Sequence, residues 1–221
     1  MPILLLIRHG DNDVFKTRLA GRLPGVHLNA DGLRQAQTLA EELADAPLKA
    51  IYSSPLERAL ETAAPLAAAH GLEVRVHAGL IEVDYGKLQG RTYKQLKRLK
   101  VWQMLHKQPA AVQFPGGESL TNLLQRTART LDELAAQYED HQIIACITHG
   151  DVIRMAVTHS LGLGLEEFDR FQIATASITT LALGRGRPRL LNLNQVSRLE
   201  WPKPPEPDKA TGQAANPSKT R

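Results

Sequence analysis

The sequence predicts an α/β fold: a three-layer α/β/α sandwich with a mainly parallel sheet and helices on both faces. Short apolar runs recur along the chain, as at residues 3–7 and 143–147, and are typical of buried strands. Segments with apolar residues at helical spacing separate these runs. Strands that alternate with helices favour a parallel sheet covered on both sides.

The strands are predicted from their length and from the loop residues after them. Each apolar run is too short for a stable helix. A closing hairpin is expected where two such runs are joined through the sequence GRGRP. In chain order, the expected strands are residues 3–7, 50–53, 74–76, 143–147, 178–183 and 190–194.

Two helices are expected in the first 90 residues of the chain. Asn29 is the expected N-cap of a helix that runs to about residue 44. A second helix is expected over residues 56–69, and Gly71 is expected to end it. Three residues mark its start: Ser54 and Glu57 at capping-box spacing, and Pro55 at the first helical position.

Three further helices are expected after residue 90. Thr92 and Gln95 have capping-box spacing and are expected to open a helix that runs to about residue 107. A long helix with leucines along one face follows the sequence PGGES, from about residue 120. The last helix is expected over residues 151–161.

Composition limits the classes of function. The chain has 221 residues and a net charge of +4. Half of that charge lies in residues 201–221, a Pro- and Lys-rich segment expected to be a flexible tail after a domain of residues 1–200. The rest is nearly neutral, so nucleic acid is not an expected partner. Apolar runs fall far short of the ~20 residues that cross a membrane. One cysteine, Cys146, excludes an internal disulfide, so a cytoplasmic location is expected.

Ionisable side chains gather where the predicted strands end. Arg8 and His9 follow the first strand, Arg58 the second, Glu82 lies in the loop after the third, and His149 follows the strand at residues 143–147. Ligands of such sheets bind at the carboxyl ends of the strands. These five residues are therefore the candidate catalytic residues.

The chemistry of this set favours a phosphoryl group. Arginine pairs two phosphate oxygens with its planar fork. A neutral imidazole can attack phosphorus, and a protonated carboxyl group can protonate the departing oxygen. Asp84 is the competing acid. A zinc site of His9, His149 and Glu82 is the alternative, although neighbouring arginines would repel a cation.

Four ordered motifs resemble the histidine phosphatase superfamily, also called phosphoglycerate-mutase-like, over residues 1 to about 195. They are LIRHGDN, SSPLERALETA, LIEVDYGKLQG and ITHGDVIR. The resemblance implies a phosphomonoester hydrolase that acts on a small phosphorylated metabolite without a metal or an organic cofactor. His9 would be the phosphorylated nucleophile and Glu82 the acid and then the base. Phosphoryl oxygens would be held by Arg8, Arg58, His149 and Asn12.

Departures from the mutase pattern favour the phosphatase branch. Val14 and Phe15 stand where mutases of this family carry Trp-Asn, and the stretch from residue 90 to 115 is short. A phosphoglycerate-type mutase and a catalytically silent phospho-ligand module stay as alternatives, and a homodimer stays open.

Basic residues outside the five-residue set form two groups in the sequence. Arg22, with Lys16 and Arg18, is expected to contact the rest of the substrate from the first loop. The basic run at residues 94–100 is expected to be a solvated helix face, with steering of anions as the alternative.

Overall fold

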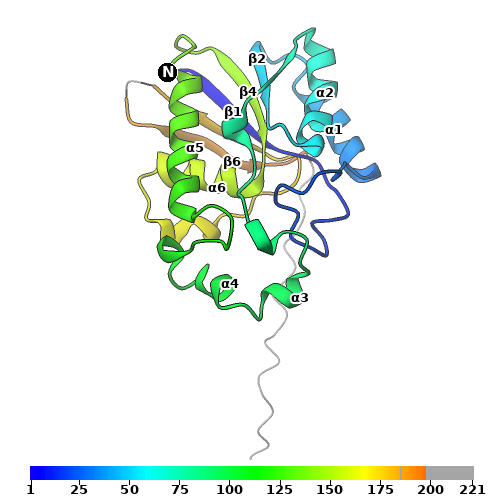
Figure 1. The fold of residues 1–221 in the computed structure, drawn as a ribbon. Helices are drawn as coiled ribbons and strands as arrows, with labels where there is room; N and C mark the ends of the chain where they lie inside the picture. The colour runs from blue at the N-terminus through cyan, green and yellow to red at the C-terminus, as the bar shows by residue number, and fades with distance from the viewer. Residues whose placement is uncertain (185, 198–221) are drawn as a thin grey trace, which may run out of the picture.

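A six-stranded sheet forms the middle layer of the structure, a computed structural model that describes residues 1–184 and 186–197 (Figure 1). The strand order is β3-β2-β4-β1-β5-β6. The first four strands of this order run parallel to one another. Next to them, β5 runs antiparallel to β1, and the edge strand β6 runs antiparallel to β5. The mainly parallel sheet and the closing hairpin are thereby confirmed, and the predicted tail lies outside the described residues. The strands are β1 (Ile3–Arg8), β2 (Leu48–Ser53), β3 (Val74–Val76), β4 (Ile143–Thr148), β5 (Ile178–Ala182) and β6 (Arg189–Gln195).

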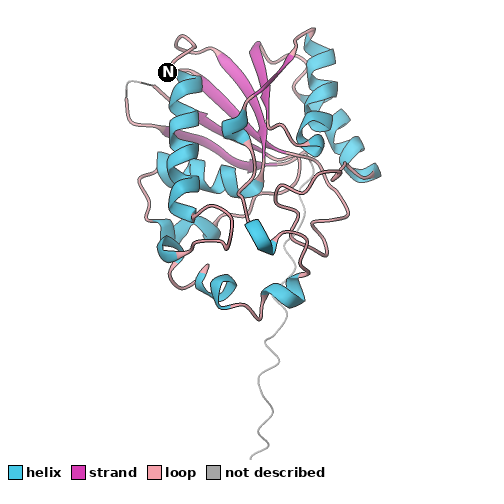
Figure 2. Cartoon of the chain, viewed as in Figure 1, coloured by secondary structure: helices cyan, strands magenta, loops and turns pink. Residues whose placement is uncertain are grey.

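Helices cover both faces of the sheet, which confirms the predicted sandwich (Figure 2). One face packs against α1 (Ala30–Glu42) and α2 (Glu57–His70), the other against α5 (Leu120–Ala135) and α6 (Gly150–Ser160). The alternation of side chains along β1 divides the core. Leu5 and Ile7 pack with Leu39 and Leu66 of the first helix pair. Leu4 and Leu6 pack with Leu131 and Ile153 of the second.

A third apolar cluster lies beyond the carboxyl ends of the parallel strands. It packs beneath the short helices α3 (Tyr93–Leu96) and α4 (Lys100–Met104) and the 3₁₀ helix Leu165–Arg170. The predicted single helix to residue 107 is therefore wrong, although the Thr92–Gln95 capping box is present. Leu96 and Leu105 are both buried in this cluster. A continuous helix would point residues nine apart in opposite directions at 100° per residue, so the chain must bend between them.

The predicted capping box of α2 is also wrong. The N-cap is Leu56, no side chain caps the helix, and Pro55 precedes its first turn. Ser54 Oγ lies 2.7 Å from His149 Nε2. The Glu57 carboxylate accepts from the amide of Gly25 at 3.0 Å. Both capping side chains are engaged elsewhere, in the candidate site and in the first loop.

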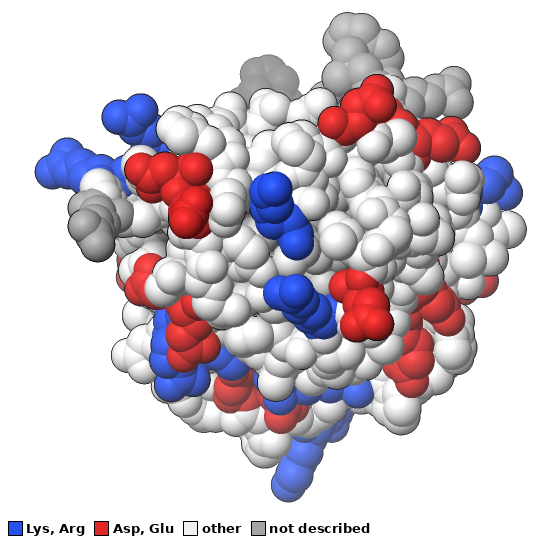
Figure 3. Space-filling view, turned by 90° about the horizontal axis from the view of Figure 1, so that it is seen from above, with Lys and Arg blue, Asp and Glu red and all other residues white. Residues whose placement is uncertain are grey.

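Other predicted helix ends are confirmed. The Asn29 side chain accepts from the Gly32 amide at the start of α1. Gly71 ends α2 in the left-handed conformation, at φ 61°. Among the described residues, no helix is both long and apolar enough to span a bilayer. Acidic and basic side chains are interspersed on the face seen from above (Figure 3).

Candidate active site

A cavity of about 260 Å³ opens at the carboxyl ends of β1 and β4. Five predicted site residues line it together: Arg8, His9, Asn12, Arg58 and Glu82. Arg8 ends β1, Arg58 lies in the first turn of α2, and Glu82 comes from the loop between β3 and α3. The structure thus brings together residues that lie far apart in the chain.

His9 is held in a form that can act as a nucleophile. Its Nδ1 lies 2.7 Å from the carbonyl oxygen of Gly10, which can only accept, so this nitrogen carries the proton. The other nitrogen, Nε2, then keeps its lone pair. Burial lowers the pKa of His9 well below its usual range, and the charges of Arg58 and Arg8 add to the effect. The ring is therefore neutral at neutral pH.

His149 lies beside His9, with 5.2 Å between the ring centroids, and is fully buried. Its Nδ1 is 3.2 Å from Arg58 Nη2 and its Nε2 is 2.7 Å from Ser54 Oγ. Burial, with Arg58 next, lowers the pKa of His149 well below its usual range. Both ring nitrogens are engaged, so His149 orients Arg58, and its contact with phosphoryl oxygens stays a prediction. Ser54 was expected only as a helix cap.

Buried donors without partners surround the cavity. Arg58 Nη2 donates to the Gly21 carbonyl at 2.8 Å, but its Nε and Nη1 have no partner. Arg8 Nη1 donates to the Ile173 carbonyl at 2.5 Å, while its Nε is unpartnered. Asn12 Nδ2 is unpartnered as well. Leaving a buried donor unpaired is costly, so four such donors on one cavity indicate a site built for an oxyanion.

Glu82 is placed to hold a proton near neutrality. Burial, and then the charge of Asp151, raises its pKa to about 7. The Val83 amide, which donates to Oε1 at 2.9 Å, and the charges of Arg58 and Arg8 act in the opposite direction. A carboxyl group with this pKa can donate a proton in one step and accept one in the next.

The competing acid, Asp84, does not line the cavity. Its Oδ1 accepts from the Gly86 amide at 2.9 Å, and its Oδ2 lies 3.6 Å from Arg22 Nη1. Asp84 therefore shapes the loop that carries Glu82, and Glu82 is the better candidate for the acid.

Arg22 is not among the residues that line the cavity, and its expected contact with substrate stays a prediction. Its Nε donates to the Glu82 carbonyl at 2.7 Å and its Nη2 to Glu118 Oε1 at 3.1 Å. Glu118 also accepts from Arg126 Nη2 at 2.9 Å, and Arg126 Nη1 donates to the Ile81 carbonyl at 2.9 Å. Arg22 is a positioning residue for the Glu82 loop. Glu118 was not anticipated, although its place directly after two glycines in PGGES marks a loop side chain.

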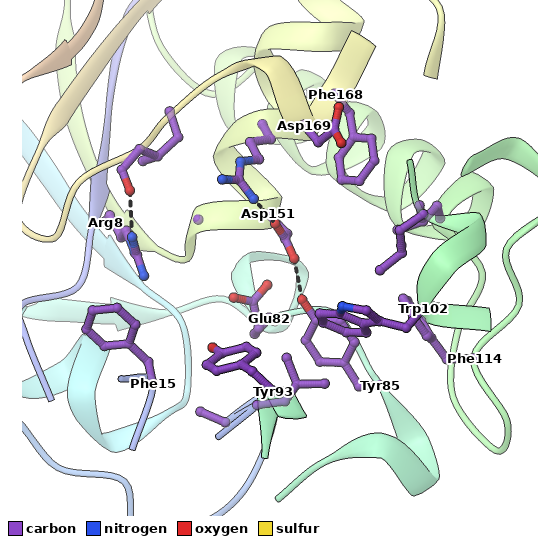
Figure 4. Close-up of a pocket in the computed structure, with 18 of the residues that line it drawn as sticks. Arg8, Phe15, Glu82, Tyr85, Tyr93, Trp102, Phe114, Asp151, Phe168 and Asp169 are labelled. Carbon is purple, nitrogen blue, oxygen red and sulfur yellow. Dashed lines mark hydrogen bonds and ion pairs between the residues drawn. The ribbon is translucent and has the colours of Figure 1, made fainter. Parts of the chain in front are cut away.

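Asp151 links Glu82 to the far wall of the cavity. Its carboxylate accepts from the Tyr85 hydroxyl and, at 2.8 Å, from Arg154 Nη1. Figure 4 shows Glu82 beside this Tyr85–Asp151 pair. Tyr85, Asp151 and Arg154 were not anticipated as site residues. The only sequence signal was their position near Glu82 and His149.

The remaining basic candidates lie away from the cavity. Lys16 pairs with Asp11 at 2.7 Å, and both Lys16 and Arg18 are exposed. The basic side chains at residues 94–100 are exposed and do not line the cavity, as expected for a solvated face. No group of three or more His, Cys, Asp or Glu in the described part of the chain could hold a metal ion.

Characterised proteins resemble this chain along most of its length. It is 31% identical to phosphoserine phosphatase 1 of Hydrogenobacter thermophilus, over 90% of this chain and 95% of that one. It is also 31% identical to a 2,3-bisphosphoglycerate-dependent phosphoglycerate mutase of Thermoplasma acidophilum, over 90% and 96%.

Solved structures give the same relationship. A phosphoserine phosphatase of Entamoeba histolytica, in complex with phosphoserine, superposes with a TM-score of 0.80 at 28% identity, over 88% of this chain and 97% of that one. A mycobacterial glucosyl-3-phosphoglycerate phosphatase superposes with a TM-score of 0.78 at 29% identity, over 87% and 98%. The family model of the histidine phosphatase superfamily (branch 1) matches residues 4–196. The chain therefore belongs to branch 1 of the histidine phosphatase superfamily.

Proposed function

We propose that this protein hydrolyses phosphomonoesters of small metabolites through a phosphohistidine on His9. The observation that carries the proposal is the neutral His9 ring, which lines one cavity with Arg8, Asn12 and Arg58, the residues that hold four buried donors without partners. Relatives named as phosphoserine phosphatases support hydrolysis of small phosphorylated metabolites.

The reaction has two steps. His9 Nε2 attacks phosphorus, so a P–N bond forms while the ester P–O bond breaks and Glu82 gives its proton to the leaving oxygen. Water then attacks the phosphohistidine, Glu82 takes a proton from this water, and the P–N bond breaks to release inorganic phosphate. Arg8, Arg58 and Asn12 hold the phosphoryl oxygens through both steps.

The test is to trap the intermediate. After incubation with a labelled phosphomonoester and rapid quenching in alkali, we expect acid-labile phosphate on His9. His9→Ala should lose the label and at least about 10⁴-fold in kcat. His159→Ala, which changes an exposed histidine of α6, is the matched control. Normal turnover by His9→Ala would refute the proposal.

A mutase is the second candidate, favoured by the relative from Thermoplasma acidophilum. A mutase returns the phosphoryl group to the substrate instead of to water. Isomerisation of 3-phosphoglycerate that is faster than phosphate release would identify it. Phosphate release without isomerisation would identify the phosphatase.

A further inference from the structure

The cavity continues past the phosphoryl donors into an aromatic and aliphatic wall. Figure 4 shows Arg8 and Phe15 on one side of the cavity and Trp102 and Phe114 on the other, with Glu82 between them. This far part, here called the leaving-group wall, comprises Tyr85, Tyr93, Trp102, Leu105, Phe114 and Phe168. The wall lies where the alcohol portion of a substrate would extend once its phosphoryl group meets His9.

The wall is preformed. The Tyr85 and Phe114 rings meet edge to face with 4.9 Å between centroids, and Phe114 is fully buried. Trp102 is half-buried, and its ring lies 6.4 Å from that of Tyr85. Fixed rings bind an apolar group with little loss of side-chain freedom.

The charged groups at the wall are already compensated. Arg154 donates to Asp151 and, through Nε, to the Phe171 carbonyl, each at 2.8 Å. His106 Nδ1 lies 2.5 Å from Asp169 Oδ2. Apart from Arg8 and Arg58, which face the phosphoryl group, Arg154 is the one arginine among the described lining residues, and no lysine is among them. A substrate carboxylate would lose its hydration here without gaining an unpaired cation.

The space exceeds that of a phosphoryl group alone. The cavity measures about 260 Å³. A cavity that holds a single water needs only about 10–15 Å³. A ring-sized alcohol portion would therefore have room beside the wall.

We propose that the leaving-group wall selects phosphomonoesters of aromatic or other bulky apolar alcohols over phosphorylated carboxylic acids. This inference rests on the proposed phosphatase function, because it assigns the substrate class of the same site. The proposed selectivity distinguishes this chain from the relative whose structure holds phosphoserine, because phosphoserine carries a carboxylate.

The test compares esters whose alcohols leave with similar difficulty: 2-phenylethyl phosphate, n-propyl phosphate, phosphoserine and 3-phosphoglycerate. We expect kcat/KM for 2-phenylethyl phosphate to exceed that of each other ester by about 30-fold, mainly through KM, because the wall buries one phenyl ring. A carboxylated ester that is turned over as well as 2-phenylethyl phosphate would overturn this inference and leave the proposed function intact. Failure to hydrolyse any ester would overturn both.

Two variants of one residue assign the preference to the wall. Trp102→Ala should reduce the ratio of kcat/KM for 2-phenylethyl phosphate to that for n-propyl phosphate by about tenfold. Trp102→Phe keeps a ring and should restore most of the ratio. An unchanged ratio in a folded Trp102→Ala protein would overturn the inference, and thermal melting of each variant checks the folding.

Discussion

The two ends of the cavity are built from different kinds of structure. The phosphoryl end consists of residues at the edge of the sheet, such as Arg8 at the end of β1 and Arg58 at the start of α2. The leaving-group wall consists of residues from short helices and loops beyond the sheet, such as Trp102 of α4 and Phe114. The sheet edge supplies charge and chemistry, whereas the loops supply shape. Changes at the first end should therefore reduce turnover of every ester, and changes at the wall should alter the choice among esters.

The largest effect within this comparison is expected from Glu82→Gln, which removes the acid between the two ends. For 2-phenylethyl phosphate, whose alkoxide leaves poorly, kcat should fall by about 10²–10⁴-fold. The first-turnover burst of p-nitrophenol from p-nitrophenyl phosphate should be retained, because that leaving group departs without a proton. Rapid-quench and stopped-flow measurements compare the two. Equal losses for both esters would contradict the role of Glu82 as acid.

Arg58→Gln should have the next largest effect. It removes the two unpartnered donors Nε and Nη1 together with their charge. Each well-placed donor to a developing oxyanion contributes about 10²–10³-fold, so kcat/KM should fall by at least this factor for every ester. The ratio between 2-phenylethyl and n-propyl phosphate should stay within about threefold. A large change in this ratio would break the division between the two ends.

Arg75→Gln is the matched control for this loss. Arg75 is an exposed arginine on β3 that donates to the Tyr138 hydroxyl at 3.2 Å, and it does not line the cavity. Its loss should leave kcat/KM for both esters close to that of the parent protein. The control separates the removal of an arginine from the removal of the oxyanion donors.

The two ends also differ in how far the sequence predicts them. Arg8 and His9 lie at the end of β1, Glu82 lies in the loop after β3, and parallel strands bring their carboxyl ends to one edge. Local pattern and one general rule were enough to gather these residues. The wall has no comparable rule, because the placement of Trp102 depends on where α3 and α4 separate. That bend is set by burial of Leu96 and Leu105 in one cluster, which no local pattern states.

Arg22 shows the same limit at a single residue. Its position in the first loop predicts a contact with substrate, but no local pattern predicts that its guanidinium binds Glu118, which lies 96 residues later in the chain. Ser54 is a second case, because a serine before a helix is usually a cap and here contacts His149. Side-chain partners that distant in sequence are set by tertiary packing.

The smallest effect on activity is expected from a change at Asp151, which acts on Glu82 and contacts the leaving-group wall. Asp151 lies in the first turn of α6, directly after β4, and it accepts from the Tyr85 hydroxyl of the leaving-group wall. The charged and titratable groups that act on Glu82 are Asp151, which raises its pKa, and Arg58 and Arg8, which lower it. Tyr85 stays neutral, because burial and Asp151 raise its pKa well above the usual value.

Asp151→Asn should shift the pH profile of kcat/KM to the acid side. The reaction needs protonated Glu82, so activity falls as pH rises through its pKa of about 7. Without the neighbouring negative charge this pKa falls, and the alkaline limb moves to lower pH. At pH 7.5 kcat/KM should drop by about threefold, while at pH 5.5 it should change by less than about twofold.

Asp169→Asn is the control, because Asp169 lines the same cavity but is not among the charges that shift Glu82. Ionisation of the ester itself is the same for parent and variants, so it cancels in the comparison. A limb that moves equally in Asp169→Asn would mean that the shift is not specific to Asp151. An alkaline limb that stays in place in Asp151→Asn would mean that the Asp151 charge does not set the acidity of Glu82. In that case the wall would affect only which alcohol binds, and the two ends of the cavity would act independently.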